Sequence, residues 1–216
     1  MRSTIEKFIM LLRSIKEIFL AVFLLGSSVA AETYSLDPTY NGDTVYFNST
    51  ARLEFVGGKT ENVSGMFTFD PENPEGSIGG VLAVDLRTLK TGIATRDGHM
   101  RDNHLHTEKY PFAYFHIDSL VPVISLSVAD SIYIAKVMGR FYIHGVYREI
   151  EADLTIVRSI ANSKGESIKV RAKFAIKLDE FKIPRPRALF LKLAETIEVV
   201  AVFRGFSGAP AEQIEL

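Results

Sequence analysis

The chain has 216 residues, with 25 Lys and Arg against 26 Asp and Glu, and it contains no Cys. This near-neutral balance excludes a protein that binds nucleic acid through a strongly basic surface. The lack of Cys excludes disulfides and thiol chemistry, so the fold depends on its core alone. A hydrophobic share of 47% is sufficient for one domain with such a core.

The N-terminal residues have the pattern of an export signal. Basic residues, among them Lys7, Arg13 and Lys16, precede the short apolar run Ile18–Leu25, and Ser28–Ala31 supplies the small residues of a cleavage site. The run is too short for a spanning helix, which needs about 20 apolar residues, and this favours cleavage over an uncleaved anchor. We therefore predict a signal peptide at 1–30 and a mature domain at 31–216. The mature domain is expected to be periplasmic or secreted and not to span a membrane.

Beyond residue 32, apolar and polar residues alternate almost throughout, which indicates strands. Residues 45–55 form one long alternating run with Phe47 and Phe55 on the same face, and Ile168–Ile176 alternates with basic residues. Gly57–Gly58 is typical of a turn between strands. Similar alternating runs cover 63–69, 78–86, 113–120, 132–143, 149–157 and 196–203.

About eight strands in a chain of this length predict an all-β fold. A closed antiparallel β-barrel of lipocalin-like form is favoured over an open sheet, because closure removes the exposed strand edges. One polar segment, Arg87–Pro111, has no period of two and is too long for a simple turn. We expect it to form a lid over one barrel end, with a short helix at Ile93–Asn103. Arg96 and Asp97 should fix this lid to the barrel through ion pairs or hydrogen bonds to neighbouring backbone.

Four side chains in the lid segment raise the alternative of a metal-binding module or a metal-dependent hydrolase. They are His99, His104, His106 and Glu108. Three or four such ligands must converge on one ion, and their spacing matches no compact zinc motif such as HExxH. Polar loop groups that bond to nearby carbonyls and acids would give the same pattern. The sequence favours this simpler interpretation and predicts neither a metal nor a cofactor.

The sequence carries no recognisable catalytic motif. Gly57–Thr60 resembles the end of a phosphate-binding loop, but the position five residues before Gly58 is Leu53 instead of Gly. Neither a nucleophile elbow nor a dinucleotide-binding fingerprint occurs. A binding protein is therefore favoured over an enzyme.

The 15 Phe residues are spread over nearly all the expected strands. In a barrel of about eight strands, the inward side chains either fill the lumen or enclose one small ligand. An apolar lumen can hold a lipid tail, because burial contributes roughly 0.8 kcal/mol per methylene. Arg185 and Arg187, in a proline-containing loop, could contact a phosphate or carboxylate head group, although solvated loop charges would look the same. The residues predicted to contact the ligand on alternate faces are Phe47, Phe55, Phe67, Phe115, Phe141 and Phe174.

Several motifs, in order along the chain, resemble those of the YceI-like family. Tyr34–Pro38 and Ser64–Phe69 are similar to two of its strand motifs, the second being G-x-F-x-F. Leu89–Phe115 contains elements that resemble its R-D-x-H-L-R and Y-P-x-x-x-F patterns, and Met138–Val146 resembles its G-x-L-T-I-x-G-V strand pair. The resemblance implies a lipocalin-like barrel that binds a polyisoprenoid or a related amphiphile in its lumen.

Three stretches depart from the family pattern, namely Thr39–Gly42, Phe141–Tyr142 and Glu180–Pro186. They are expected in loops or at the rim, so the fold expectation is unaffected, while the identity of the lipid and its head-group contacts stay open. An amphiphilic lipid of the isoprenoid or fatty-acyl type is thus the expected partner. A homodimer is left open.

Overall fold

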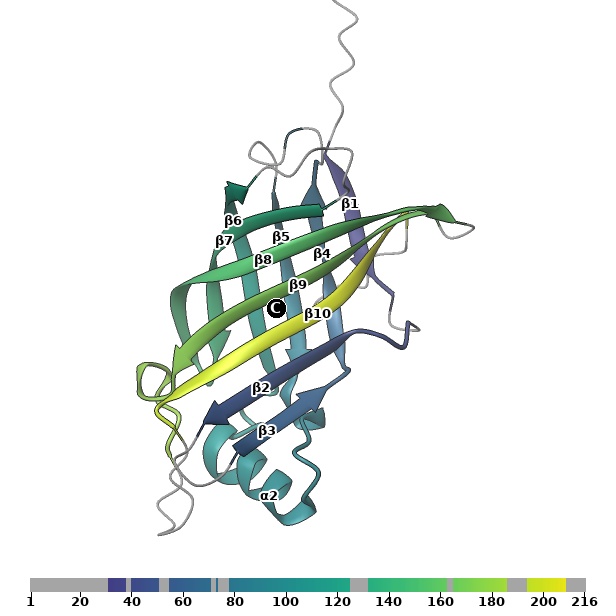
Figure 1. The fold of residues 1–216 in the computed structure, drawn as a ribbon. Coiled ribbons are helices and arrows are strands. Elements are labelled where there is room, and N and C mark those ends of the chain that lie inside the picture. The colour runs from purple at the N-terminus through teal and green to yellow at the C-terminus, as the bar shows by residue number, and fades with distance from the viewer. Residues whose placement is uncertain are drawn as a thin grey trace, which may run out of the picture. The chain divides into compact units, whose positions relative to one another are not determined.

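The computed structural model describes residues 31–37, 40–50, 55–70, 73, 78–124, 132–162, 165–185 and 194–208 (Figure 1). The strands are β1 (Glu32–Leu36), β2 (Thr44–Thr50), β3 (Phe55–Thr60), β4 (Val63–Phe69), β5 (Gly79–Asp85), β6 (Phe112–Ile124), β7 (Ile132–Ile143), β8 (Val146–Asn162), β9 (Gly165–Lys177) and β10 (Thr196–Ser207). The helical elements are η1 (Leu86–Thr88), α2 (Ala94–His99), η2 (Met100–Leu105) and η4 (Asp179–Phe181).

The strands form a closed antiparallel barrel, which confirms the predicted fold class. Hydrogen-bonded neighbours follow the order β1-β4-β5-β6-β7-β8-β9-β10, and β10 pairs back to β1. The hairpin β2–β3 completes the ring at the other end of β10. There, β2 continues the line of β1 along β10, and β3 leads directly into β4. Each of these two pairs serves as one interrupted strand, so the ring has eight strand positions.

The pairing register shows how the interrupted strands close the ring. β1 pairs with β10 up to Leu36 and Gly205, and β2 resumes the same edge at Thr44 and Val202. On the far side of β3, Lys59 and Lys90 exchange both backbone hydrogen bonds, at 2.8 and 2.9 Å. This single bridge covers the edge of β3 at Lys59.

The single strand predicted over residues 45–55 is wrong. The structure has two strands there, because the chain reverses and Thr50 pairs with Phe55. Gly57–Gly58 lies inside β3 and not in a turn. A Cβ on Gly58 would collide with the ring of Phe47 and with the Lys90 carbonyl. Glycine is needed here for close approach of backbone and ring, a requirement that the sequence pattern does not distinguish from a turn.

The lid segment forms a short helix near its predicted position. α2 passes into the π-helical turn η2, and together they lie at the barrel end that carries β2 and β3 (Figure 1). Leu105 of η2 is buried and packs with Leu86 and Leu89. His106 ends the helix in the left-handed conformation, with φ of 48°. In the described part of the chain, no helix is long and apolar enough to cross a membrane.

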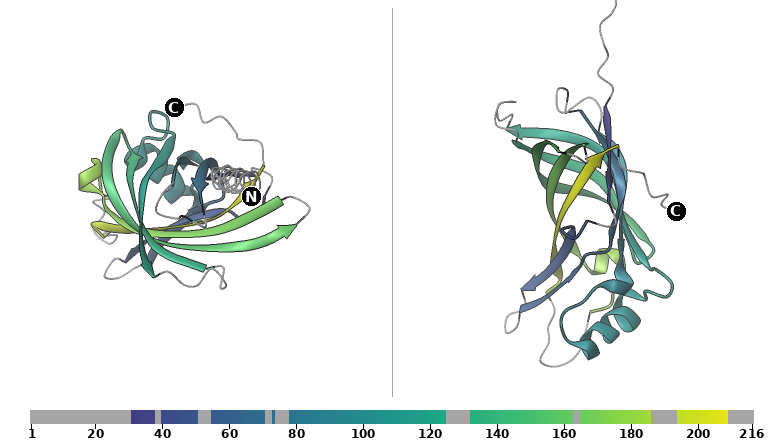
Figure 2. Two further views of the ribbon diagram at one scale, coloured as in Figure 1. Left: turned by 90° about the horizontal axis from the view of Figure 1, so that it is seen from above. Right: turned by 90° about the vertical axis from the view of Figure 1, so that its right-hand side faces the viewer.

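Inward-pointing residues make up the core, as the alternation predicted. In β4 every second residue from Val63 to Phe69 is buried, and β7 follows the same pattern from Ala135 to Ile143. The view along the barrel shows these strands curving around a common interior (Figure 2). The core has two clusters, one at the lid end and one toward the other end, and Phe115 and Phe174 pack against both.

Candidate ligand-binding cavity

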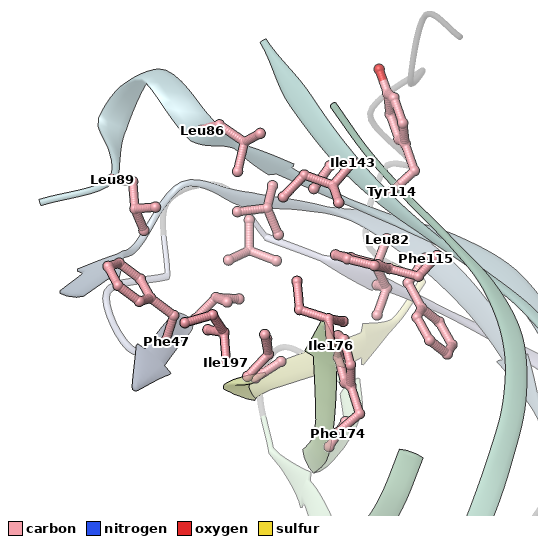
Figure 3. A pocket seen from close by; sticks show the side chains of 18 of the residues that line it. Phe47, Leu82, Leu86, Leu89, Tyr114, Phe115, Ile143, Phe174, Ile176 and Ile197 are labelled. Atoms are coloured by element: carbon pink, nitrogen blue, oxygen red, sulfur yellow. The ribbon is translucent and has the colours of Figure 1, made fainter. Parts of the chain in front are cut away.

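A cavity of about 580 Å³ lies inside the barrel and reaches the lid. Its walls are the inward faces of the strands, which are almost entirely apolar because of the period of two in the sequence. Figure 3 shows Phe47 and Ile197 on one side of it, with Leu86 and Leu89 nearby and Phe115 and Phe174 across from them. Residues that line it include Val45, Leu82, Val84, Ile143, Val170, Ile176 and Phe203.

Five of the six predicted lumen residues line this cavity. They are Phe47, Phe67, Phe115, Phe141 and Phe174. The sixth, Phe55, is the first residue of β3, and its side chain lies outside the described part of the structure.

The Phe side chains contact one another across strands. Phe174 lies 5.2 Å from Phe141 between ring centroids, and Phe67 lies 5.9 Å from Phe203. Such edge-on aromatic contacts give the wall a fixed shape.

The two predicted head-group arginines are not part of the cavity wall that the structure describes. Arg185 is exposed, its Nη1 lies 4.0 Å from Oε2 of Glu195, and it does not line the cavity. Arg187 lies outside the described residues. The position of Arg185 therefore gives no support to a contact with a head group.

Polar groups enter the cavity wall at one end. Apart from Tyr114, whose hydroxyl points away from the cavity in Figure 3, the polar lining side chains of the described chain all come from the lid. The cavity is thus apolar through the barrel and polar under the lid, which is the polarity of an amphiphile. These lid residues are Thr91, Thr95, Arg96, His99 and His104.

Arg96 and Asp97 shape the lid itself. The Thr91 backbone N–H donates to Asp97 Oδ1 at 2.7 Å, and the Thr91 hydroxyl donates to the same oxygen. Arg96 donates from Nε to the Thr91 hydroxyl oxygen at 2.8 Å and from Nη2 to the Thr91 carbonyl at 3.2 Å. The expected hydrogen bonds to neighbouring backbone are present, but these contacts join the lid to itself and not to the barrel.

The charge state of Asp97 follows from these contacts. Burial acts to raise the pKa of Asp97, but the Thr91 hydrogen bonds and the charges of Arg101 and Arg96 outweigh it and hold the pKa below its ordinary value. Asp97 is thus an anion at neutral pH, and this fits a structural anchor better than a general acid.

The histidines of the lid are not gathered as a metal site. His104 Nδ1 lies 2.7 Å from the Pro184 carbonyl, and His106 Nδ1 lies 2.7 Å from Nε2 of His144. Within the described residues, no three side chains of His, Asp or Glu are close enough to hold an ion. The metal alternative therefore has no assembled ligand set to support it.

Sequence reasoning missed part of the wall. Leu82, Ile143 and Ile197 follow the strand alternation, so the same pattern could have identified them. Leu178 and Ile183 also line the cavity, but they flank the short helix η4, where no periodic signal exists. Partners of the lid histidines, such as His144, are distant in sequence and have no signal of their own.

A closed antiparallel barrel around an apolar cavity, with a short helical lid, has the architecture of lipocalin-like binding proteins. The sequence matches the model of the YceI-like domain over residues 34–204, and the chain belongs to this family. No match was found among curated proteins.

Several solved structures share the fold. BcnA of Burkholderia cenocepacia superposes with a TM-score of 0.65 at 15% identity, over 78% of this chain and 98% of its own. A polyisoprenoid binding domain from Saccharophagus degradans, implicated in plant cell wall breakdown, gives 0.62 at 22% identity, over 81% and 98%. The YceI protein of Campylobacter jejuni gives 0.58 at 20% identity, over 73% and 86%. At these identities the likeness concerns the fold.

Proposed function

We propose that this protein binds one amphiphilic lipid, with the tail inside the barrel and the polar end under the lid. The observation that carries this is the cavity of about 580 Å³, whose wall is apolar except at the lid. Burial contributes roughly 0.8 kcal/mol per methylene, so a tail of about ten methylenes gains on the order of 8 kcal/mol. That gain works against the loss of translational, rotational and chain freedom on binding.

An isoprenoid or fatty-acyl tail fits this cavity in chemical type. The lining offers Phe, Leu, Ile and Val side chains and, away from the lid, almost no hydrogen-bonding group. Such a wall selects for a hydrocarbon tail, because any polar atom buried there without a partner costs about 1–3 kcal/mol. The domain of similar fold from Saccharophagus degradans is described as binding polyisoprenoids, which supports the same ligand class.

Binding without catalysis is proposed as the whole activity of the domain. Two titratable groups at the lid end have structural partners: Asp97 accepts from Thr91, and His104 contacts the Pro184 carbonyl. We further propose that residues 1–30 direct export, on the strength of the apolar run and the small residues that follow it. The intact mass of protein recovered from the periplasm or medium of a bacterial host tests this.

Lipid binding can be tested with the uncharged fluorescent probe N-phenyl-1-naphthylamine. We expect saturable enhancement of its emission at one site per chain, and displacement by farnesol and by a long-chain fatty alcohol. Short-chain alcohols should displace it far less well, because affinity follows the number of buried methylenes. Absence of saturable probe binding, or probe binding that none of these amphiphiles displaces, would overturn the proposal.

A further inference from the structure

The barrel wall has a gap between β8 and β9 at the lid end. The ladder between these strands begins at the pair Asp153–Lys173 and runs toward their connecting turn. On the other side of this pair, residues 146–152 of β8 pair with β7 and residues 174–177 of β9 pair with β10. None of these described residues pairs across the gap. Figure 1 shows β8 and β9 close together at one end and separated at the other.

The short helix η4 fills this gap. It follows β9 directly and contacts both β8 and β9. Phe181 is fully buried, and its ring centroid lies 5.6 Å from that of Phe141. Leu178 and Ile183, on either side of η4, line the cavity. A single helical turn therefore stands where strand pairing would otherwise form the wall.

Two histidines hold η4 and the residues after it from outside. His144, in the β7–β8 turn, lies with Nδ1 3.2 Å from the Phe181 carbonyl. His104 of the lid lies with Nδ1 2.7 Å from the Pro184 carbonyl. A third histidine, His106, contacts His144 and so connects the lid to the β7–β8 turn. The segment formed by η4 and the residues after it, the lid and the β7–β8 turn thus meet at one cluster of three histidines.

The hydrogen bonds define where the protons are. A carbonyl can only accept, so His144 carries a proton on Nδ1 and presents the lone pair of Nε2. His106 must then donate from Nδ1 to this lone pair. A proton on Nε2 of His106 leaves this bond intact, because the bond uses Nδ1. A second proton, on His144 Nε2, places two N–H groups and two positive charges against each other.

The surroundings of His144 make the second proton disruptive. His144 is 9% exposed, and its ring packs edge-on against the ring of Tyr110, with 5.0 Å between the centroids. Lys109 and His106 on the lid add positive charge. The charged residues next to Phe181, namely Asp179 and Glu180 of η4 and Lys182 after it, are exposed. Burial lowers the pKa of His144; the Phe181 carbonyl opposes this, and the charges of His106 and Lys109 lower the pKa further.

We propose that η4 is a gate in the barrel wall, and that double protonation of the His106–His144 pair releases it. A charged His144 moves toward water, and its hydrogen bond to the Phe181 carbonyl is then lost. A bound lipid is then retained at neutral pH and exchanged at acidic pH. The statement about lipid rests on the proposed function, whereas the opening of η4 does not.

Because the chain has no Cys, a thiol introduced by Ile183→Cys reports on opening without interference. Ile183 is 5% exposed in the closed barrel. The rate of its labelling by a maleimide is compared with the rate in the same variant carrying His144→Asn, at each pH from 8 to 5. The ratio cancels the ionisation of the thiol. Asn suits position 144 because it tolerates the φ of 54° and can donate from Nδ2 to the Phe181 carbonyl.

Below about pH 6.5 we expect the ratio of labelling rates to rise, by up to about tenfold per pH unit for one linked proton. His116→Gln is the matched control, since His116 is on β6, outside the cavity lining, and should leave the rise unchanged. A ratio that stays constant from pH 8 to 5, or a rise abolished by His116→Gln, would overturn the gate. His104→Ala is a second test, independent of residue 144. It should speed labelling at neutral pH and keep the pH response, and no change in rate would count against η4 being held by histidines.

Release of N-phenyl-1-naphthylamine is measured in parallel. In the unmodified sequence the rate of release should increase over the same pH range, and His144→Asn should suppress the increase. If the probe does not bind at neutral pH, the proposed function fails while the labelling ratio still decides the gate. If the probe binds and the labelling ratio is flat, the gate fails while the proposed function stands.

Discussion

Phe115 of β6 and Phe174 of β9 touch across the lumen, with ring centroids 5.9 Å apart, although β7 and β8 lie between their strands in the sheet. Both rings pack against the core cluster at the lid end and against the cluster beyond it. The pair therefore lies at the middle of the cavity, where a lipid tail would have to pass.

The variant pair Phe174→Asp and Phe174→Leu tests this position. A carboxylate facing an apolar cavity without a partner costs several kcal/mol, so Phe174→Asp should weaken probe binding by at least about tenfold or prevent folding. Phe174→Leu keeps an apolar side chain and should retain most of the affinity. Fluorescence titration measures binding, and circular dichroism separates a folding defect from a binding defect. A folded Asp variant with full affinity would show that this face is not in contact with the ligand.

Asp97 should stabilise the lid only while it is ionised. Its pKa is held below the ordinary value, so its contribution is present above about pH 4 and is lost as the pH falls below that value. Asp97→Asn keeps an acceptor for the Thr91 N–H but removes the charge, and should cost about 1–2 kcal/mol at pH 7. Thermal melts from pH 7 to 3 measure the difference. The difference in stability between the parent and Asp97→Asn should become smaller at acidic pH. A difference that is independent of pH would contradict the role of the charge.

Ionisation of Asp43 should destabilise the folded state, whereas ionisation of Asp97 stabilises it. It is 3% exposed and accepts from the Arg204 N–H at 2.9 Å, and burial raises its pKa to about 6 against the lowering effect of Arg204. The folded state therefore prefers the protonated form, and stability is lost as the pH rises from about 4 to 6. Over this pH range the free energy of unfolding of Asp43→Asn should rise relative to that of the parent protein, by at most about 2–3 kcal/mol. A variant less stable than the parent at pH 7.5 would show that Arg204 stabilises the anion.

Tyr34 joins the closing strand β1 to the rest of the barrel. Its ring is fully buried and lies 5.7 Å from that of Phe67, while its hydroxyl reaches Glu32 at 3.0 Å and Glu166 at 3.1 Å. Tyr34→Phe should cost about 0.5–1.5 kcal/mol, because only a hydrogen bond is lost. Tyr34→Ala should cost about 3–5 kcal/mol, because a cavity is left behind. Urea unfolding distinguishes the two, and equal losses would place the closure in the hydroxyl network instead of the packing.

The sequence contained the information for the barrel wall. A period of two specifies one face of each strand, so the strands from β4 to β10 and five of the lumen Phe residues could be placed from the pattern alone. The lid was also predictable, because a polar stretch of that length cannot join the wall.

Closure of the ring was not predictable in detail, since it depends on long-range pairing. β1 is five residues long and carries little periodic signal, and the reversal between Thr50 and Phe55 is hidden by continued alternation. Similarly, the bond between His106 and His144 joins residues 38 positions apart. Tertiary contacts of this kind override local pattern, and only the folded structure displays them.

The most direct test of the central claim is the composition of the protein as it is isolated. Native mass spectrometry and an organic extract should show one amphiphile with a long apolar tail per occupied chain, and Phe174→Asp should reduce the occupied fraction. The unmodified chain should also bind N-phenyl-1-naphthylamine after the amphiphile is extracted. A chain with no bound lipid, nothing in the extract and no affinity for the probe would contradict the claim that the barrel is a lipid-binding site.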